Sequence, residues 1–240
     1  GHTLLFATPT YTLATAMKLA TYDFAKDLAP VALTGLIAYT MVVNPDVPAN
    51  SVADLVALAR AKPGQINCAS AGYGTVPHLA CETFNKVAGV DVIHVPFRDV
   101  NSAMMGTVGG HVQMFVAVST VAKQQIEAGT VRGLAVTTAQ RSTLLPQLPT
   151  LAESGYPTFV MPGWGGLMAP AGTPKEVVDK INAEVRRALA KPEIAAKLLG
   201  VGMEAPPPMG ADAFGAFIKE DIARWTALVD AVGRDKLTEP

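Results

Sequence analysis

Short apolar runs alternate with amphipathic segments along most of the chain. Apolar β-branched runs are typical of buried strands, whereas apolar residues repeated every three or four positions are typical of helices. The pattern predicts strands at 3–8, 30–36, 39–45, 66–70, 90–96, 112–118 and 131–138, and helices at 76–88, 101–109, 120–128 and 211–232. This alternation indicates an α/β fold with a parallel sheet and helices on both of its faces.

Local signals mark where further helices begin. Ser51 and Asp54 resemble a capping box, and Asn101 is expected to cap the helix that ends at Gly109–Gly110. Proline in the first turn predicts helix starts at Thr173 and Lys191. The stretch 139–162 has little periodicity, so we expect a connector or a packed loop there.

The segment 68–84, CASAGYGTVPHLACETF, places a loop of small residues between a strand and a helix. Such a loop presents either a nucleophile or backbone N–H groups. A nucleophile elbow would need glycine where Cys68 stands, and an acid and a histidine later in the chain. An enzyme that uses Ser70 therefore remains only as an alternative. The dinucleotide fingerprint also lacks its third glycine, which leaves an anion-holding loop that needs no cofactor.

Metal and thiol chemistry have little support in the sequence. The four histidines show no ligand spacing, so we expect no metal site. Cys68, on the strand, and Cys81, in the helix that returns, lie at similar heights. A disulfide and two free buried thiols both remain open, and the free-thiol interpretation is slightly favoured.

Composition excludes several classes of protein. The chain has 240 residues and a net charge of −1, which excludes a general basic surface for nucleic acid. Its longest apolar stretch, 31–45, is broken by Gly35 and is too short for a membrane span. No signal-peptide pattern stands at Gly1, where the chain opens almost directly on a strand, so we expect further material upstream.

Five long blocks carry a resemblance to a known family: residues 22–35, 42–89, 94–115, 129–157 and 163–189. Together they resemble the substrate-binding proteins of tripartite tricarboxylate transporters, also called Bug receptors. The resemblance implies a two-lobed fold like that of periplasmic binding proteins, with mostly parallel sheets flanked by helices and a hinge of two crossovers. Residues 1–41 and 163–240 would form the first lobe, incomplete at its N-terminus, and 42–162 the second.

The resemblance also implies a function. Such a receptor is not an enzyme: it captures a small organic carboxylate in the periplasm, without a cofactor, and delivers it to the membrane components of the transporter without itself entering the membrane. A truncated fragment that binds nothing is the alternative, because the family normally has a further strand, helix and strand before the first strand here. Their absence should leave apolar surface exposed in the first lobe.

Carried over to this sequence, the ligand residues fall in four places: a turn after the first strand, the glycine loop with a histidine behind it, an aromatic–basic pair, and the end of a later strand. They are Thr8, Thr10, Ser70, Gly72, Tyr73, Gly74, Thr75, His78, Phe97, Arg98 and Val116. We expect the loop to bind a carboxylate through backbone N–H groups and the hydroxyls of Ser70 and Thr75. Many members carry Asp where this chain has Val116, which predicts a solute without a cationic centre.

Overall fold

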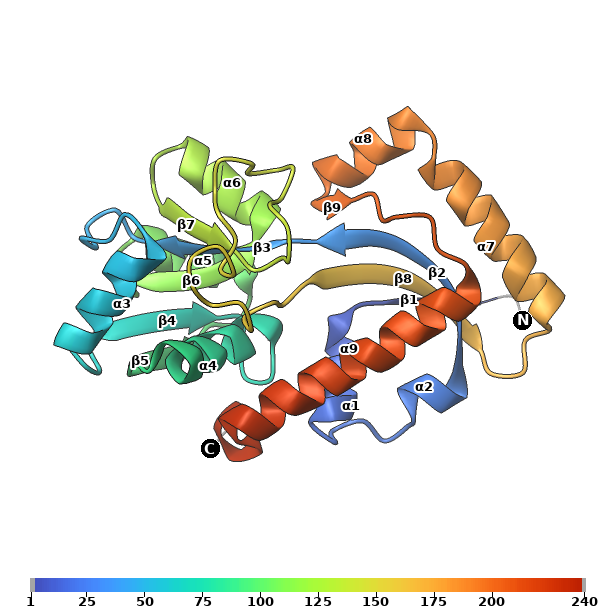
Figure 1. Ribbon diagram of the computed structural model, residues 1–240, viewed down its shortest axis with the longest axis horizontal. Coiled ribbons are helices and arrows are strands. Elements are labelled where there is room, and N and C mark those ends of the chain that lie inside the picture. The colour runs from blue at the N-terminus through green and yellow to red at the C-terminus, as the bar shows by residue number, and fades with distance from the viewer. Residues whose placement is uncertain (1–2, 239–240) are drawn as a thin grey trace. The chain divides into compact units, whose positions relative to one another are not determined.

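The computed structural model describes residues 3–238, which form two compact units (Figure 1). Unit 1 consists of the described residues up to Ile37 together with Gly163–Asp230. Unit 2 consists of Ala38–Pro162 together with the described residues from Ala231 onward. Each unit has its own sheet, so the α/β fold class is confirmed and each unit can be described by itself.

Unit 1 is built on a four-stranded sheet in which every neighbouring pair is antiparallel. Its order is β1 (Leu5–Ala7), β8 (Gly163–Pro170), β2 (Leu28–Ile37) and β9 (Met203–Glu204). The helices of this unit are α1 (Pro9–Ala16), α2 (Phe24–Asp27), α7 (Lys175–Leu189), α8 (Pro192–Gly200) and α9 (Ala211–Val232), which runs on into unit 2. The second strand in this order, β8, comes from the later part of the chain and joins β1 to β2.

Alternate residues of β8 face different helices, because successive side chains of a strand point to opposite faces. Trp164 and Met168 share a buried cluster with Phe214 of α9. Ala169 instead packs with Val178 of α7. The two helices therefore cover opposite faces of the sheet, and the stripe along 211–232 is core, as the sequence predicts.

A fully buried carboxylate joins three elements of unit 1. Oδ2 of Asp221 in α9 accepts hydrogen bonds from Oγ1 of Thr12 at 2.7 Å, and from Nε1 of Trp164 and of Trp225, each at 2.9 Å. Its Oδ1 accepts from Nη1 of Arg224 at 3.0 Å. A buried charge is tolerated when it is paired and hydrogen-bonded in this way, and here it ties α1 and β8 to α9.

Unit 2 is built on a five-stranded mixed sheet (Figure 1). Its order is β5 (Val92–Pro96), β4 (Ile66–Ser70), β6 (Met114–Val118), β3 (Tyr39–Val43) and β7 (Arg132–Val136). The connecting helices are α3 (Val52–Ala61), α4 (Val76–Ala88), α5 (Val100–Val108) and α6 (Ser119–Glu127), and a 3₁₀ turn follows at Arg234–Leu237. Strand β4 pairs in parallel with β5 and β6, whereas β3 runs antiparallel to β6 and β7.

The expectation of mostly parallel sheets is therefore wrong: the sheet of unit 1 is antiparallel and that of unit 2 is mixed. The order of strands and helices along the chain was predicted well, but direction depends on which strands become neighbours. The strand β3 inserts between β6 and β7, and β8 returns between β1 and β2, and both insertions reverse the direction. Neither insertion leaves a signal in local periodicity.

The unit boundaries differ from the expected lobes at two places. Residues 38–41 begin strand β3 of unit 2, and the residues after Asp230 also join unit 2. There Leu237 is buried, and Lys236 lines a small pocket with Glu82 and Lys86 of α4. The chain thus passes between units at three points, 37/38, 162/163 and 230/231, rather than at two crossovers.

The stretch 139–162 is a packed loop. Leu144, Leu145 and Leu148 form a buried cluster with Val136 of β7. The hydroxyl of Thr137 donates to the carbonyl of Met161 at 2.9 Å, which fixes the far end of the loop. Within residues 3–238, no helix is long and apolar enough to cross a membrane.

Candidate anion-binding loop

The glycine loop lies between β4 and α4, where the sequence places it. Helix α4 begins after Thr75, whose Oγ1 accepts from the backbone N–H of His78 at 3.4 Å, with Pro77 in the first turn. It ends at Gly89, whose φ of +60° closes the helix in the left-handed conformation. The strand and the N-terminal end of the helix therefore both open onto residues 70–75.

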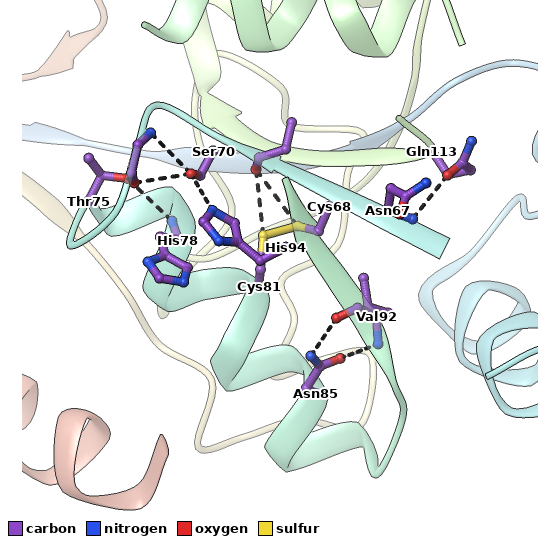
Figure 2. Close-up of a disulfide and its surroundings, with 12 residues drawn as sticks. Asn67, Cys68, Ser70, Thr75, His78, Cys81, Asn85, Val92, His94 and Gln113 are labelled. Carbon is purple, nitrogen blue, oxygen red and sulfur yellow. Dashed lines mark hydrogen bonds between the residues drawn. A yellow bond between two sulfur atoms is a disulfide. The ribbon is translucent and has the colours of Figure 1, made fainter. Parts of the chain in front are cut away.

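Two tethers fix α4 against the sheet (Figure 2). Cys68 of β4 and Cys81 of α4 form a disulfide, with their Cα atoms 6.0 Å apart and both side chains fully buried. Farther along the helix, the side-chain amide of Asn85 exchanges two 2.8 Å hydrogen bonds with the backbone of Val92 in β5. The interpretation of two free thiols is wrong. Helix α4 runs back along strand β4, which brings the sulfur atoms of Cys68 and Cys81 within bonding distance.

Two positions in the loop require glycine. Gly72 has a φ of +111° and Gly74 a φ of +67°. Side chains strain the backbone at such angles, whereas glycine adopts them freely. The sequence prediction that these glycines shape the loop agrees with this geometry.

The two hydroxyls expected to contact the ligand are instead engaged inside the loop. Oγ of Ser70 is fully buried, accepts from the N–H of Gly72 at 3.1 Å and lies 2.6 Å from Nε2 of His94. Oγ1 of Thr75 donates to the carbonyl of Gly72 at 2.7 Å. Both hydroxyls hold the shape of the loop, and a contact of either with the solute stays a prediction.

Two histidines form a stacked pair under the loop. The rings of His78 and His94 lie 3.7 Å apart and are nearly parallel, and Tyr73 packs edge-on against both. Nδ1 of His78 accepts from the N–H of Gly74 at 3.2 Å, which places its own proton on Nε2. Burial, with a smaller contribution from His94, lowers the pKa of His78 to about 3, and burial lowers that of His94 to about 4. Both rings are therefore neutral at pH 7.

Sequence analysis did not include His94 in the site. His94 pairs with Cys68 in the parallel ladder between β5 and β4. Ser70 lies two residues beyond Cys68, so the three side chains share one face of the sheet. The pairing of these two strands would have revealed the contact, but a single sequence does not give that register.

The contact between Ser70 and His94 also bears on the enzyme alternative. The sequence offered no nucleophile–base pair, and the structure brings one within hydrogen-bond distance. However, Ser70 is fully buried, and among the described residues no carboxylate holds Nδ1 of His94 in the manner of a triad. The pair holds backbone groups and is not poised for attack on a substrate.

The remaining expected residues lie in different settings. Thr8 caps α1 in unit 1 without a side-chain cap bond, and Thr10 is exposed in the first turn. In unit 2, the Phe97 ring packs so closely on Gly106 that a Cβ there would lie 2.6 Å from its Cζ. Arg98 is exposed and pairs with Asp99 at 3.2 Å, and Val116 is fully buried in β6. Phe97 and Val116 both take part in packing, and a contact of either with a solute stays a prediction.

Asp99 has a structural role that the sequence did not assign to it. Its carboxylate accepts from the N–H of Ser102 at 2.8 Å, and the Ser102 hydroxyl accepts from the N–H of Asp99. This capping box starts α5 at Asp99, so the expectation that Asn101 caps the helix is wrong. Within the described part of the chain, no group of three or more His, Cys, Asp or Glu side chains could hold a metal ion.

The fold and loop define a class of protein, the two-lobed α/β binding proteins of the periplasmic type. The model of the family described as "Tripartite tricarboxylate transporter family receptor" matches residues 1–234. The chain belongs to this family.

Two curated relatives give the same result. The chain is 36% identical over 212 residues to a UPF0065 protein in the tcbD-tcbE intergenic region of Pseudomonas sp. strain P51, covering 87% of this chain and 62% of that protein. It is 30% identical over 236 residues to protein BugT of Bordetella pertussis, covering 97% and 72%. The chain therefore spans about two thirds of the length of these relatives.

Two solved structures share the fold. One is Rpa4515 of R. palustris with adipate, with a TM-score of 0.86 and 31% identity, covering 97% of this chain and 78% of that one. The other is MatC (Rpa3494) from Rhodopseudomonas palustris with bound malate, with a TM-score of 0.81 and 29% identity, covering 95% and 79%. Adipate and malate are both dicarboxylates.

Proposed function

We propose that this chain is the binding portion of a receptor that captures a small organic carboxylate and delivers it to the membrane components of a tripartite tricarboxylate transporter. The loop at residues 70–75 carries the proposal. It combines left-handed glycines, the N-terminus of a 13-residue helix and backbone N–H groups at Ala71, Tyr73 and Thr75 that find no acceptor within residues 3–238. Such N–H groups and the helix terminus favour an anion.

The uncharged character of the loop supports binding without a reaction. Both histidines are neutral at pH 7, and the nearest expected cation, Arg98, is exposed and paired with Asp99. A carboxylate held by neutral N–H donors gains charge-assisted hydrogen bonds without a proton transfer. We therefore assign the chain to a receptor and not to an enzyme, in agreement with the adipate and malate named for the two similar structures.

The disulfide supports a periplasmic location. Disulfides form and persist in oxidising compartments such as the periplasm and are rare in the cytosol. The bridge between Cys68 and Cys81 lies in the core of unit 2, directly below the proposed site. We infer that the protein folds and works outside the cytoplasm.

The polarity of the buried strand bears on the class of solute. Val116 and Ala117 of β6 are both buried and neither carries a side-chain acceptor for an ammonium group. Burying an unpaired ammonium costs several kcal/mol. We therefore expect a mono- or dicarboxylate without a cationic centre.

Titration calorimetry at pH 7.5 with adipate, malate, succinate and aspartate tests the proposal. We expect saturable binding of at least one of the first three acids, weaker binding of aspartate than of succinate, and no turnover of the bound acid. No binding of any of the four would contradict the receptor assignment for this chain. Tighter binding of aspartate than of succinate would contradict only the exclusion of a cationic centre.

A further inference from the structure

One continuous path of contacts runs beneath the glycine loop, and Figure 2 shows its Ser70, His94 and His78 side chains. It begins at the N–H of Gly72, which donates to Oγ of Ser70, and continues from Ser70 to Nε2 of His94 at 2.6 Å. The ring of His94 stacks on that of His78, whose Nδ1 accepts from the N–H of Gly74. The path therefore starts and ends on the two glycine N–H groups of the loop.

This path divides the N–H groups of the loop into two sets. Those of Gly72 and Gly74 are satisfied by Ser70 and His78. Those of Ala71, Tyr73 and Thr75 have no acceptor among the described residues. Because Gly72 and Gly74 flank Tyr73, fixing their N–H groups also fixes the peptide units on either side of it.

We propose that His78 and His94 are positioning residues for the carboxylate site: His78 accepts from the N–H of Gly74, and His94, stacked on His78, holds the Ser70 hydroxyl that accepts from the N–H of Gly72, so that the N–H groups of Tyr73 and Thr75 are held ready for the anion. This inference rests on the proposed function and adds a role for two side chains that need not touch the solute. His78 is almost completely buried, which agrees with a role behind the loop.

The lock requires an uncharged imidazole at His78. A protonated His78 would carry a hydrogen on Nδ1, and two donors would then face each other at Gly74. Tyr73 is the ionisable side chain that packs on both rings. Within residues 3–238, no acidic or basic side chain forms an ion pair with either ring. The low pKa values of both rings, caused chiefly by burial, agree with this requirement.

A competing role is that the histidines are cationic partners of the anion. In that case affinity would fall as pH rises through about 6.5, the usual histidine pKa. The neutral lock instead predicts an affinity for adipate or malate that changes less than about twofold between pH 5.5 and 8, after correction for ionisation of the ligand. A tenfold loss over that range would overturn the neutral lock.

Matched substitutions distinguish the loss of the hydrogen-bonding group from the loss of the volume of the ring. Asn at position 78 places Oδ1 near the site of Nδ1 and Gln at position 94 places an amide near Nε2, whereas Leu fills the space without an acceptor. We expect His78→Asn and His94→Gln to bind within about threefold of wild type, and His78→Leu to bind at least roughly tenfold more weakly. His111→Leu, an exposed histidine outside the path, is the control and should bind as wild type does.

Nitrogen-15 NMR of the histidine rings tests the lock without any ligand. We expect His78 to show an unprotonated Nδ1 and a protonated Nε2 at pH 7, and the Gly74 amide to exchange slowly with solvent. A His78 with its proton on Nδ1, or a His78→Leu protein that folds and binds as wild type does, would overturn the inference. Failure of the wild type to bind any acid of the panel would overturn the receptor function, and the NMR result would still decide whether the lock exists.

Discussion

Nε1 of Trp164 donates a 2.9 Å hydrogen bond to Oδ2 of Asp221, so a residue of β8 and one of α9 share a fully buried carboxylate. Two further neutral donors, Thr12 and Trp225, and the guanidinium of Arg224 converge on the same group. One buried acceptor therefore serves donors from three elements of unit 1.

Removing this carboxylate should be costly. We predict that Asp221→Ala lowers the free energy of unfolding by about 3–5 kcal/mol, because it leaves buried donors without an acceptor. Asp230→Ala, an exposed site on the same helix, should change it by less than about 0.5 kcal/mol. Urea unfolding followed by tryptophan fluorescence measures both, and equal effects of the two substitutions would contradict the network.

The disulfide should stabilise unit 2 through its unfolded state. Cys68 and Cys81 are 13 residues apart in sequence, and closing a loop of this length contributes about 3 kcal/mol in the chain-entropy description. We predict that the double substitution Cys68→Ala with Cys81→Ala lowers the free energy of unfolding by about 2–4 kcal/mol. Urea unfolding of the two proteins without reductant tests this, and a stability equal to wild type would contradict a formed bridge.

Gly74 and Gly89 offer a matched pair at opposite ends of α4. Their φ angles are +67° and +60°, so alanine should strain the backbone by about 1 kcal/mol at either site. We predict that both substitutions lower thermal stability similarly, but that only Gly74→Ala weakens binding of the carboxylate that the wild type binds. Calorimetry on both variants decides the point, and unchanged binding in Gly74→Ala would mean that the loop is only structural.

The histidine pair should make stability depend on pH. In the unfolded chain both rings titrate near pH 6.5, whereas in the folded chain their pKa values are about 3 for His78 and about 4 for His94. Between these limits the unfolded state binds more protons, so the free energy of unfolding falls as pH is lowered from about 6.5 towards 4. The slope is at most about 1.4 kcal/mol per pH unit for each histidine.

Urea unfolding from pH 7 to pH 5 measures this slope. The double substitution His78→Asn with His94→Gln should flatten it, and comparison with wild type cancels the carboxylates that also titrate near the lower limit. A slope that is the same in both proteins would assign the acid sensitivity to other groups.

Local signals predicted the elements of the fold well. Helix α4 spans Val76–Ala88, as periodicity indicated, because its apolar face, its Thr75 cap and its Gly89 end are all local. The glycines of the loop were likewise visible in the sequence. Strand direction was not, since β3 and β8 each insert between strands distant in sequence.

The internal chemistry of the loop could not be predicted for a related reason. From the sequence alone, the hydroxyls of Ser70 and Thr75 are both available to a ligand. In the fold, Ser70 contacts His94 and Thr75 donates to the carbonyl of Gly72. The sequence likewise does not show that the ring of Phe97 packs on Gly106. The role of a polar or aromatic side chain depends on its neighbours across the sheet, and these are set by strand register.

The interleaved order of the sheet in unit 1 has a consequence for folding. The strands β1 and β2 precede residues 38–162 in the chain, and their shared partner β8 follows that segment. Domains tend to fold as units, and contacts between segments distant in sequence form slowly, so unit 2 can close its sheet while the first two strands of unit 1 are still unpaired. Until Gly163–Pro170 pairs with them, those strands present open edges that can pair with another chain.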